Sequence, residues 1–139
     1  MRRQQWVSGL VLAGVAAVGV AGVGGCSHHQ APMGPPVAAP ADAATVADIR
    51  RAYKQADPDA VVGLVIATLP DSQLAAVADV PVSEFKAGDV VTFIDSNQAT
   101  IAVGKVEVVK EDVIHVKYEP RGDAARAPQE GDLAVRVRS

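Results

Sequence analysis

The sequence of 139 residues predicts a mainly β protein, in which a small six-stranded barrel follows one short helix. Three observations predict this fold. Short runs rich in Val and other branched residues recur between turn residues, which is typical of strands. Two of these runs begin after the same Gly-Asp pair, and one run shifts the parity of its apolar positions, which indicates a β-bulge. Short strands in this number favour a closed barrel, because closure leaves no exposed sheet edge.

The helix is expected over residues 45–57. Thr45, three residues before Asp48, has the form of an N-terminal cap. Apolar residues from Val46 to Ala56 then recur at helical spacing, and Asp57-Pro58 ends the pattern because a residue before proline avoids helical geometry. A helix of about three turns is not stable alone, so we expect it to pack on another element.

The strands are expected within a β-barrel domain that covers residues 58–139. The first two strands are separated only by the turn residues Pro70-Asp71-Ser72, so they are predicted to form a hairpin. The six predicted strands are 61–69, 74–80, 90–94, 101–109, 113–118 and 133–137.

Alternation within the last two strands predicts which side chains face the core, since successive side chains of a strand point to opposite faces. In the fifth strand the inward set is Ile114, Val116 and Tyr118, opposite His115 and Lys117. In the last strand the inward set is Leu133, Val135 and Val137, opposite Arg136 and Arg138.

The fourth strand contains the parity shift. Ile101 and Val103 occupy odd positions, whereas Val106 and Val108 occupy even ones. An inserted residue is needed to keep both pairs on one face, and Gly104 is the expected site of this bulge.

The glycines beside the strands carry a resemblance to a known fold. Gly88-Asp89 and Gly131-Asp132 are expected to form tight turns, because Gly adopts positive φ and Asp binds neighbouring amides. Together with Gly63 and Val103-Gly104-Lys105-Val106, these pairs resemble the small SH3-like barrel modules of bacterial envelope proteins, such as the C-terminal module of flagellar assembly protein T. The resemblance implies an SH3-like barrel over residues 61–138.

A second resemblance lies at the N-terminus. Two arginines precede an uncharged stretch from Trp6 to Gly25, which is the layout of a bacterial secretory signal. Val23-Gly24-Gly25-Cys26 resembles the lipobox of bacterial lipoproteins. The resemblance implies a signal peptide over 1–25, cleavage between Gly25 and Cys26, and acylation of the Cys26 sulfur.

The acylated cysteine is expected to hold the protein to membrane lipid, since each buried methylene contributes about 0.8 kcal/mol. Within the lipoprotein resemblance, Ser27 is compatible with the periplasmic face of the outer membrane. Residues 26–44, rich in Pro and Ala, are expected to form a flexible tether. Two alternatives stay open: a single-pass membrane anchor, because the apolar stretch reaches spanning length, and an ordinary cleaved signal with a free thiol.

Composition and motifs argue against several functions. Of 13 basic and 16 acidic residues, only two arginines precede the cysteine, so the remainder carries a formal charge of −5 and lacks the basic footprint that nucleic acid requires. No metal or other cofactor is expected, because His28 and His29 lie in the tether without further ligands. No catalytic residue is expected, because the serines lack a nucleophile elbow and His115 lacks partner groups.

The sequence therefore predicts a non-enzymatic lipoprotein of the cell envelope, whose barrel binds an envelope protein or gives structural support. Arg121, Arg136 and Arg138 are expected to contact the partner, from the charged loop over 119–131 and from the outward face of the last strand. A module that binds cell wall or a small ligand is the alternative, and an enzyme is a third reading.

Overall fold

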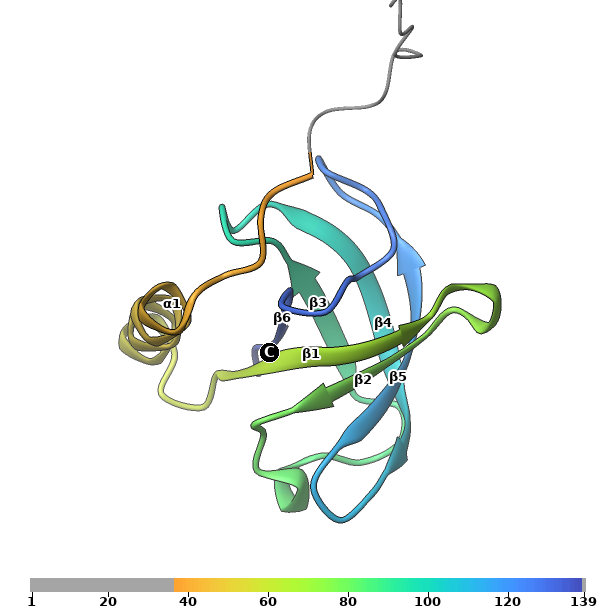
Figure 1. Cartoon of the computed structure of the whole chain (residues 1–139). Coiled ribbons are helices and arrows are strands. Elements are labelled where there is room, and N and C mark those ends of the chain that lie inside the picture. Colours follow the sequence, from red (N-terminus) through yellow and green to blue (C-terminus); the bar gives the residue numbers. More distant parts are fainter. Residues whose placement is uncertain (1–36, 139) are drawn as a thin grey trace, which may run out of the picture. The chain divides into compact units, whose positions relative to one another are not determined.

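The computed structural model describes residues 37–138, which form a closed antiparallel barrel with one helix at its side (Figure 1). The strands follow the order β1-β2-β5-β4-β3-β6 around the barrel. Their bounds are β1 (Val61–Leu69), β2 (Leu74–Ala78), β3 (Val90–Ile94), β4 (Thr100–Val109), β5 (Ile114–Pro120) and β6 (Leu133–Arg136). The predicted fold class is confirmed. The predicted signal peptide and the first part of the predicted tether lie outside the described residues.

The helix α1 (Ala43–Ala56) begins two residues before the expected start. Its cap is Asp42, not Thr45: an Asp42 carboxylate oxygen accepts a hydrogen bond of 2.7 Å from the Thr45 amide. A carboxylate satisfies an orphan amide of the first turn as a hydroxyl would, and this hydrogen bond lowers the pKa of Asp42. The predicted end at Asp57 is confirmed, since the Asp57 amide donates to the Tyr53 carbonyl and closes the last turn.

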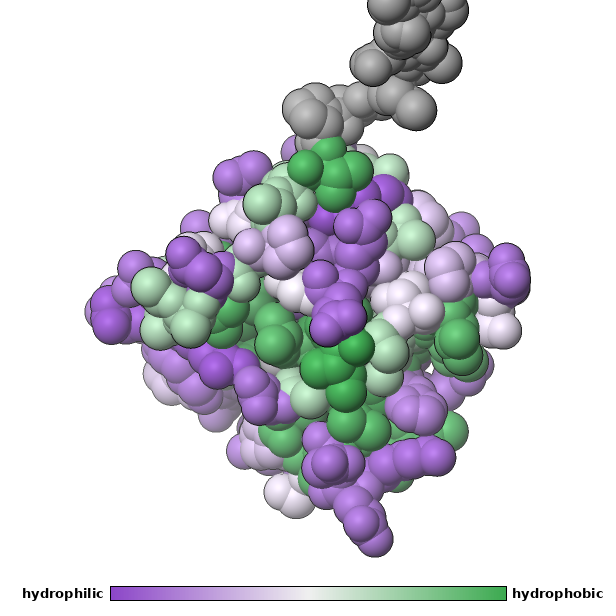
Figure 2. Space-filling model, in the orientation of Figure 1, coloured by the Kyte–Doolittle hydropathy of each residue, from purple (hydrophilic) through white to green (hydrophobic). Residues whose placement is uncertain are grey.

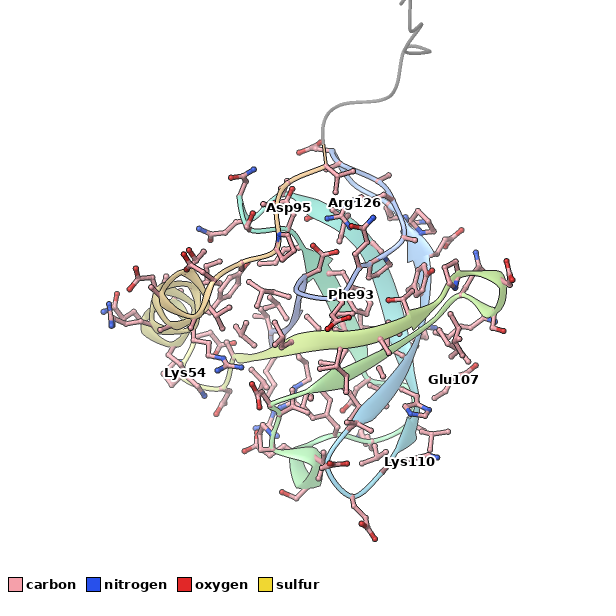
Figure 3. All side chains as sticks on the ribbon, in the orientation of Figure 1. Lys54, Phe93, Asp95, Glu107, Lys110 and Arg126 are labelled. Carbon is pink, nitrogen blue, oxygen red and sulfur yellow. The ribbon has the colours of Figure 1, made fainter. Side chains whose placement is uncertain are left out.

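The barrel interior holds aliphatic side chains from all six strands and three aromatic rings. Phe93 is fully buried in the middle of the barrel (Figure 3). Its ring meets Tyr118 edge-on, with the ring centroids 6.1 Å apart. Ile114, Val116 and Tyr118 are buried and Lys117 is exposed, so the predicted alternation of β5 is confirmed. Burial raises the pKa of Tyr118 above its usual value.

A second buried cluster lies on the outer face of β1, β3 and β6, where α1 covers the sheet. Val46 and Ile49 of the helix pack in this cluster with Leu133 and Val135 of β6. The sequence placed Leu133 and Val135 in the interior, but Ala134 packs there instead. The first half of β1 is apolar at successive positions because both of its faces are covered there: Val61 and Val65 lie in the barrel, and Val62 lies under the helix.

The predicted inward position of Val137 is also wrong, since Val137 follows the last paired residue and is 52% exposed. In the β1–β2 hairpin, β2 ends at Ala78, two residues earlier than expected. Asp79 adopts a left-handed conformation with φ of 58°, which turns the chain out of the sheet.

The bulges of β4 flank Gly104 and do not include it. Phe93 pairs with Ala102 and Ile94 with Thr100, so Ile101 is the extra residue against β3. Glu107 is the extra residue against β5, which leaves Val108 on the outside and 44% exposed. Gly104 pairs regularly with both neighbouring strands, and a glycine is needed here because another backbone atom lies close to it. A Cβ there would lie 2.6 Å from the Lys117 carbonyl oxygen.

The two Gly-Asp pairs form matching turns, as predicted. Gly88 and Gly131 have φ of 94° and 91°, which favours glycine. In each turn the Asp carboxylate accepts a hydrogen bond from the amide three residues before it, Asp89 from Lys86 at 3.0 Å and Asp132 from Gln129 at 2.7 Å. The Gly88-Asp89 turn thus fixes the start of β3, and the Gly131-Asp132 turn fixes the start of β6 at the opposite end of the barrel.

Candidate interaction surface

A groove of about 450 Å³ crosses the outer face of the barrel over β4 and β5. We call it the basic groove, because three of the side chains that line it are cations. It is defined by Val90, Val103, Lys105, Lys117, Glu119 and Arg121. Val90 is 53% exposed, so the groove combines unpaired charge with accessible aliphatic surface.

Lys105 and Lys117 lie directly opposite each other on the adjacent antiparallel strands β4 and β5. Like charges in this arrangement destabilise a sheet, because opposed side chains of one face have Cβ atoms only about 5 Å apart. The Lys117 ammonium donates one hydrogen bond of 2.7 Å to the Ser72 carbonyl, which leaves two of its three donors for another acceptor.

The cations of the basic groove form no ion pair with any residue in the range 37–138. By contrast, five of the six arginines in that range do, namely Arg50, Arg51, Arg126, Arg136 and Arg138. The exception is Arg121, which lies in the groove. Lys54, Lys86 and Lys110 also form no ion pair within that range, so the groove is distinguished by three unpaired cations that lie close together on one face of a domain that is acidic as a whole.

Arg121 is exposed and begins the connection between β5 and β6. This connection, expected as a partner-binding loop, is fastened to the start of β4. The amides of Arg121 and Arg126 both donate to the Ile101 carbonyl at 3.0 Å, and the Ala124 amide donates to the Thr100 carbonyl at 3.1 Å. The carbonyl of Ile101, the extra residue against β3, thus accepts hydrogen bonds from two amides of this connection.

The predicted outward position of Arg136 is wrong. Arg136 shares its face of β6 with Ala134, so its side chain closes one end of the barrel and is only 7% exposed. Its guanidinium carbon lies 4.1 Å from the centre of the Phe85 ring, and its nitrogens lie 3.3 Å from a Glu84 carboxylate oxygen and 3.6 Å from one of Asp89. Arg136 is therefore engaged within the domain.

Arg138 is exposed, as predicted, and lies 3.7 Å from the Asp59 carboxylate. It lines a second hollow of about 340 Å³ with Lys86, Val90 and Arg136. Val90 also belongs to the basic groove, so the two hollows adjoin at this side chain. The structure thus places Arg121 and Arg138 on neighbouring hollows, whereas it buries Arg136 beneath one of them.

The opposite end of the barrel is closed by Arg126 and Asp132. The Arg126 guanidinium donates two hydrogen bonds to the Asp132 carboxylate, at 2.6 and 2.8 Å, and these bonds raise the pKa of Arg126. Asp95 lies at the same end (Figure 3) and adds to this shift. The chain that enters the domain passes here, where the Ala41 amide donates to the Gly131 carbonyl.

Apolar residues also reach the surface along β1 (Figure 2), where Ile66 and Leu69 are 42% and 62% exposed. Leu69 lines a small hollow of about 100 Å³ with Leu74 and His115. His115 faces outward, as expected, although it is half-buried. This apolar patch carries no unpaired charge that would identify a ligand, which sets it apart from the basic groove.

Gly25 and Cys26 of the predicted cleavage and acylation site, and His28 and His29 of the tether, lie outside the described residues. Within residues 37–138, no three His, Cys, Asp or Glu side chains gather in a way that would hold a metal ion. Over the same range, the chain has no helix with the length and apolar character needed to cross a bilayer.

Sequence reasoning singled out Arg121 but missed Lys105 as a site residue, and it placed Lys117 outward without a role. The available signal was the outward alternation of lysines on two successive strands. Comparison of the chain with protein-family models, with curated proteins and with solved structures finds no match.

Proposed function

We propose that the chain is a lipid-anchored protein of a bacterial cell envelope and that its barrel is a non-catalytic module that binds an envelope partner. The observation that carries the anchor is the sequence Val23-Gly24-Gly25-Cys26 at the end of an uncharged stretch. Acylation at this position explains why the only cysteine stands where apolar sequence gives way to polar sequence.

The tether sets how far the module reaches from the membrane. Pro40 and Ala41 lie against the domain at Gly131, so the free tether covers residues 27–39, which are 13 residues with three prolines. In a polyproline conformation this length spans about 40 Å. A barrel held in this way reaches partners across a substantial part of the envelope while it stays attached to the outer membrane, the membrane that Ser27 favours.

Three observations support an interaction role for the barrel. The basic groove presents unpaired cations and exposed aliphatic surface together. The aromatic side chains that a cell-wall binding module would expose for sugar stacking are buried or half-buried within residues 37–138: Tyr53, Phe85, Phe93 and Tyr118. His115 has only Ala76 and Val108 as its cross-strand neighbours, which supply no acid, base or orienting group.

Mass spectrometry of the protein from its native host tests the anchor. We expect a mature N-terminal peptide that begins at Cys26 and carries a diacylglyceryl group, and the same processing in a Ser27→Ala variant, which serves as the control. The mature form is expected to lack tryptophan emission, because Trp6 is the only tryptophan. An intact Met1 or an unmodified thiol at position 26 would overturn the proposal.

A further inference from the structure

We infer that the basic groove binds an extended acidic segment of a partner protein, with two carboxylates four residues apart and an aliphatic side chain midway between them. The inference rests on the interaction role proposed above and specifies the chemistry of its ligand.

The two opposed lysines of the basic groove need a negative charge between them. Lys105 and Lys117 repel each other across the strand pair, and no acid of residues 37–138 forms an ion pair with either. The fold accepts this repulsion, although Asp or Glu at one of the two positions would turn it into attraction. A carboxylate from another molecule, placed between the two ammonium groups, satisfies both.

The distance between the cations at the two ends of the groove sets the spacing of the ligand's carboxylates. Lys117, Glu119 and Arg121 follow one another at two-residue intervals and all line the groove. Extended chain advances about 6.6 Å in two residues, so the cations at the two ends are about 13 Å apart along the backbone. A ligand strand that runs alongside reaches both with carboxylates four residues apart.

The middle of the groove determines the residue between the two carboxylates. Glu119 lies directly opposite Val103 in the strand pair, and exposed Val90 lies opposite Lys105. A third carboxylate at the centre of the ligand would face Glu119 and be repelled. An aliphatic side chain there would instead bury surface against Val103 and Val90.

Acidic side chains on the same surface favour a polypeptide over an anionic membrane as the occupant. Glu119 lies within the groove, Glu107 bulges from β4 two residues from Lys105, and Asp123 follows Arg121 by two residues. A lipid surface brings phosphates against all of these carboxylates at once, whereas a single strand places its charges only where the cations lie.

The test measures binding of labelled peptides to the full-length acylated protein reconstituted in phosphatidylcholine vesicles. The probe contains Glu-Ser-Val-Ser-Glu, in which alternate residues face the groove, and its matched controls contain Lys-Ser-Val-Ser-Lys and Glu-Ser-Glu-Ser-Glu. We expect the first peptide to bind most tightly, with an affinity that falls as salt rises. Vesicles of phosphatidylglycerol and phosphatidylcholine, added as competitor, are expected to leave the peptide bound.

Charge reversal tests the residues. Lys105→Glu and Lys117→Glu are each expected to weaken peptide binding about fivefold or more, whereas Lys110→Glu, the same change at the β4–β5 turn, is expected to leave it unchanged. Lys105→Glu also replaces repulsion by attraction across the strands, so its thermal stability is expected to equal or exceed that of the wild type. Loss of binding without loss of stability separates recognition from folding.

Equal binding of the three peptides, displacement by anionic vesicles, or equal weakening by Lys110→Glu would overturn the inference. The state of Cys26 is measured on the same sample. If acylated protein does not bind the peptide, the proposed ligand is wrong and the proposed lipid anchor is unaffected. If protein with a free thiol binds the peptide, the proposed anchor is wrong and the proposed ligand of the basic groove is unaffected.

Discussion

Arg126 and Asp132 form a two-pronged ion pair at the end of the barrel where the chain enters the domain, with nitrogen–oxygen distances of 2.6 and 2.8 Å. Both side chains are largely buried, with exposed fractions of 17% and 5%. The same Asp132 carboxylate accepts from the Gln129 amide, so one group fixes both the turn before β6 and the loop that precedes it.

Asp132→Asn is expected to lower the free energy of unfolding by about 3 kcal/mol, because it leaves the Arg126 guanidinium buried without its counter-charge. Urea denaturation measures this change. Asp59→Asn is the matched control, since Asp59 pairs with Arg138 on the surface, where both side chains are about two-thirds exposed, and its loss is expected to cost under about 0.5 kcal/mol. Equal losses would contradict the role given to burial.

Gly104→Ala is expected to destabilise the barrel by about 2 kcal/mol. The new Cβ would lie 2.6 Å from both the Lys117 carbonyl oxygen and a Val116 methyl carbon, so β4 and β5 would have to separate. Gly88→Ala is the comparison, because nothing lies within 4 Å of its Cβ and only its φ of 94° is unfavourable, at about 1 kcal/mol. A smaller loss for Gly104→Ala than for Gly88→Ala in urea denaturation would refute the close approach.

Local patterns predicted most of the fold. The bounds of β1 and β3 and the facing of β5 follow from branched residues, turn residues and period-two alternation. The facing of β6 does not, because alternation shows which residues share a face but not which face lies inside. Once α1 covers the outer face, Leu133 is buried outside the barrel and Ala134 inside it.

The positions of the bulges and the identity of cross-strand neighbours could not be predicted from the sequence, because they depend on the pairing register. A parity shift in β4 indicates that a residue is inserted, but only the strand pairing shows that the extra residues are Ile101 against β3 and Glu107 against β5. In the same way, Lys105 and Lys117 face each other only because of the register that β4 and β5 adopt beside the bulge at Glu107. The candidate site was therefore visible as separate outward lysines and not as a pair.

Asp42→Ala is expected to lower stability in a pH-dependent way, because the Asp42 carboxylate caps α1 and its pKa is lowered by the Thr45 amide. A lowered pKa means that the folded state binds a proton less readily than the unfolded chain. The carboxylate's contribution is thus complete above the unfolded value, near 3.8, and is lost as the pH falls through the folded value.

Thermal denaturation of wild type and Asp42→Ala between pH 7 and pH 2 measures this dependence. The difference between the two proteins is expected to be constant near neutral pH and to shrink in acid. Asp48→Ala, at an exposed position of the same helix, is the control. Its stability is expected to differ from that of the wild type by less than the stability of Asp42→Ala does, because it removes no helix cap. A gap for Asp42→Ala that widens as the pH falls would reverse the sign derived from the lowered pKa.

Arg136→Met is expected to cost about 2 kcal/mol, because it removes the cation over the Phe85 ring and leaves Glu84 and Asp89 to repel each other at the barrel end. Arg136→Lys is expected to fall between wild type and Arg136→Met, since an ammonium keeps the charge but loses the planar stacking. Arg138→Met, two residues along the same chain, removes an exposed pair and is expected to cost under about 0.5 kcal/mol. If urea denaturation gave Arg138→Met the larger loss, the outward orientation of Arg136 that alternation predicts would be the better description of β6.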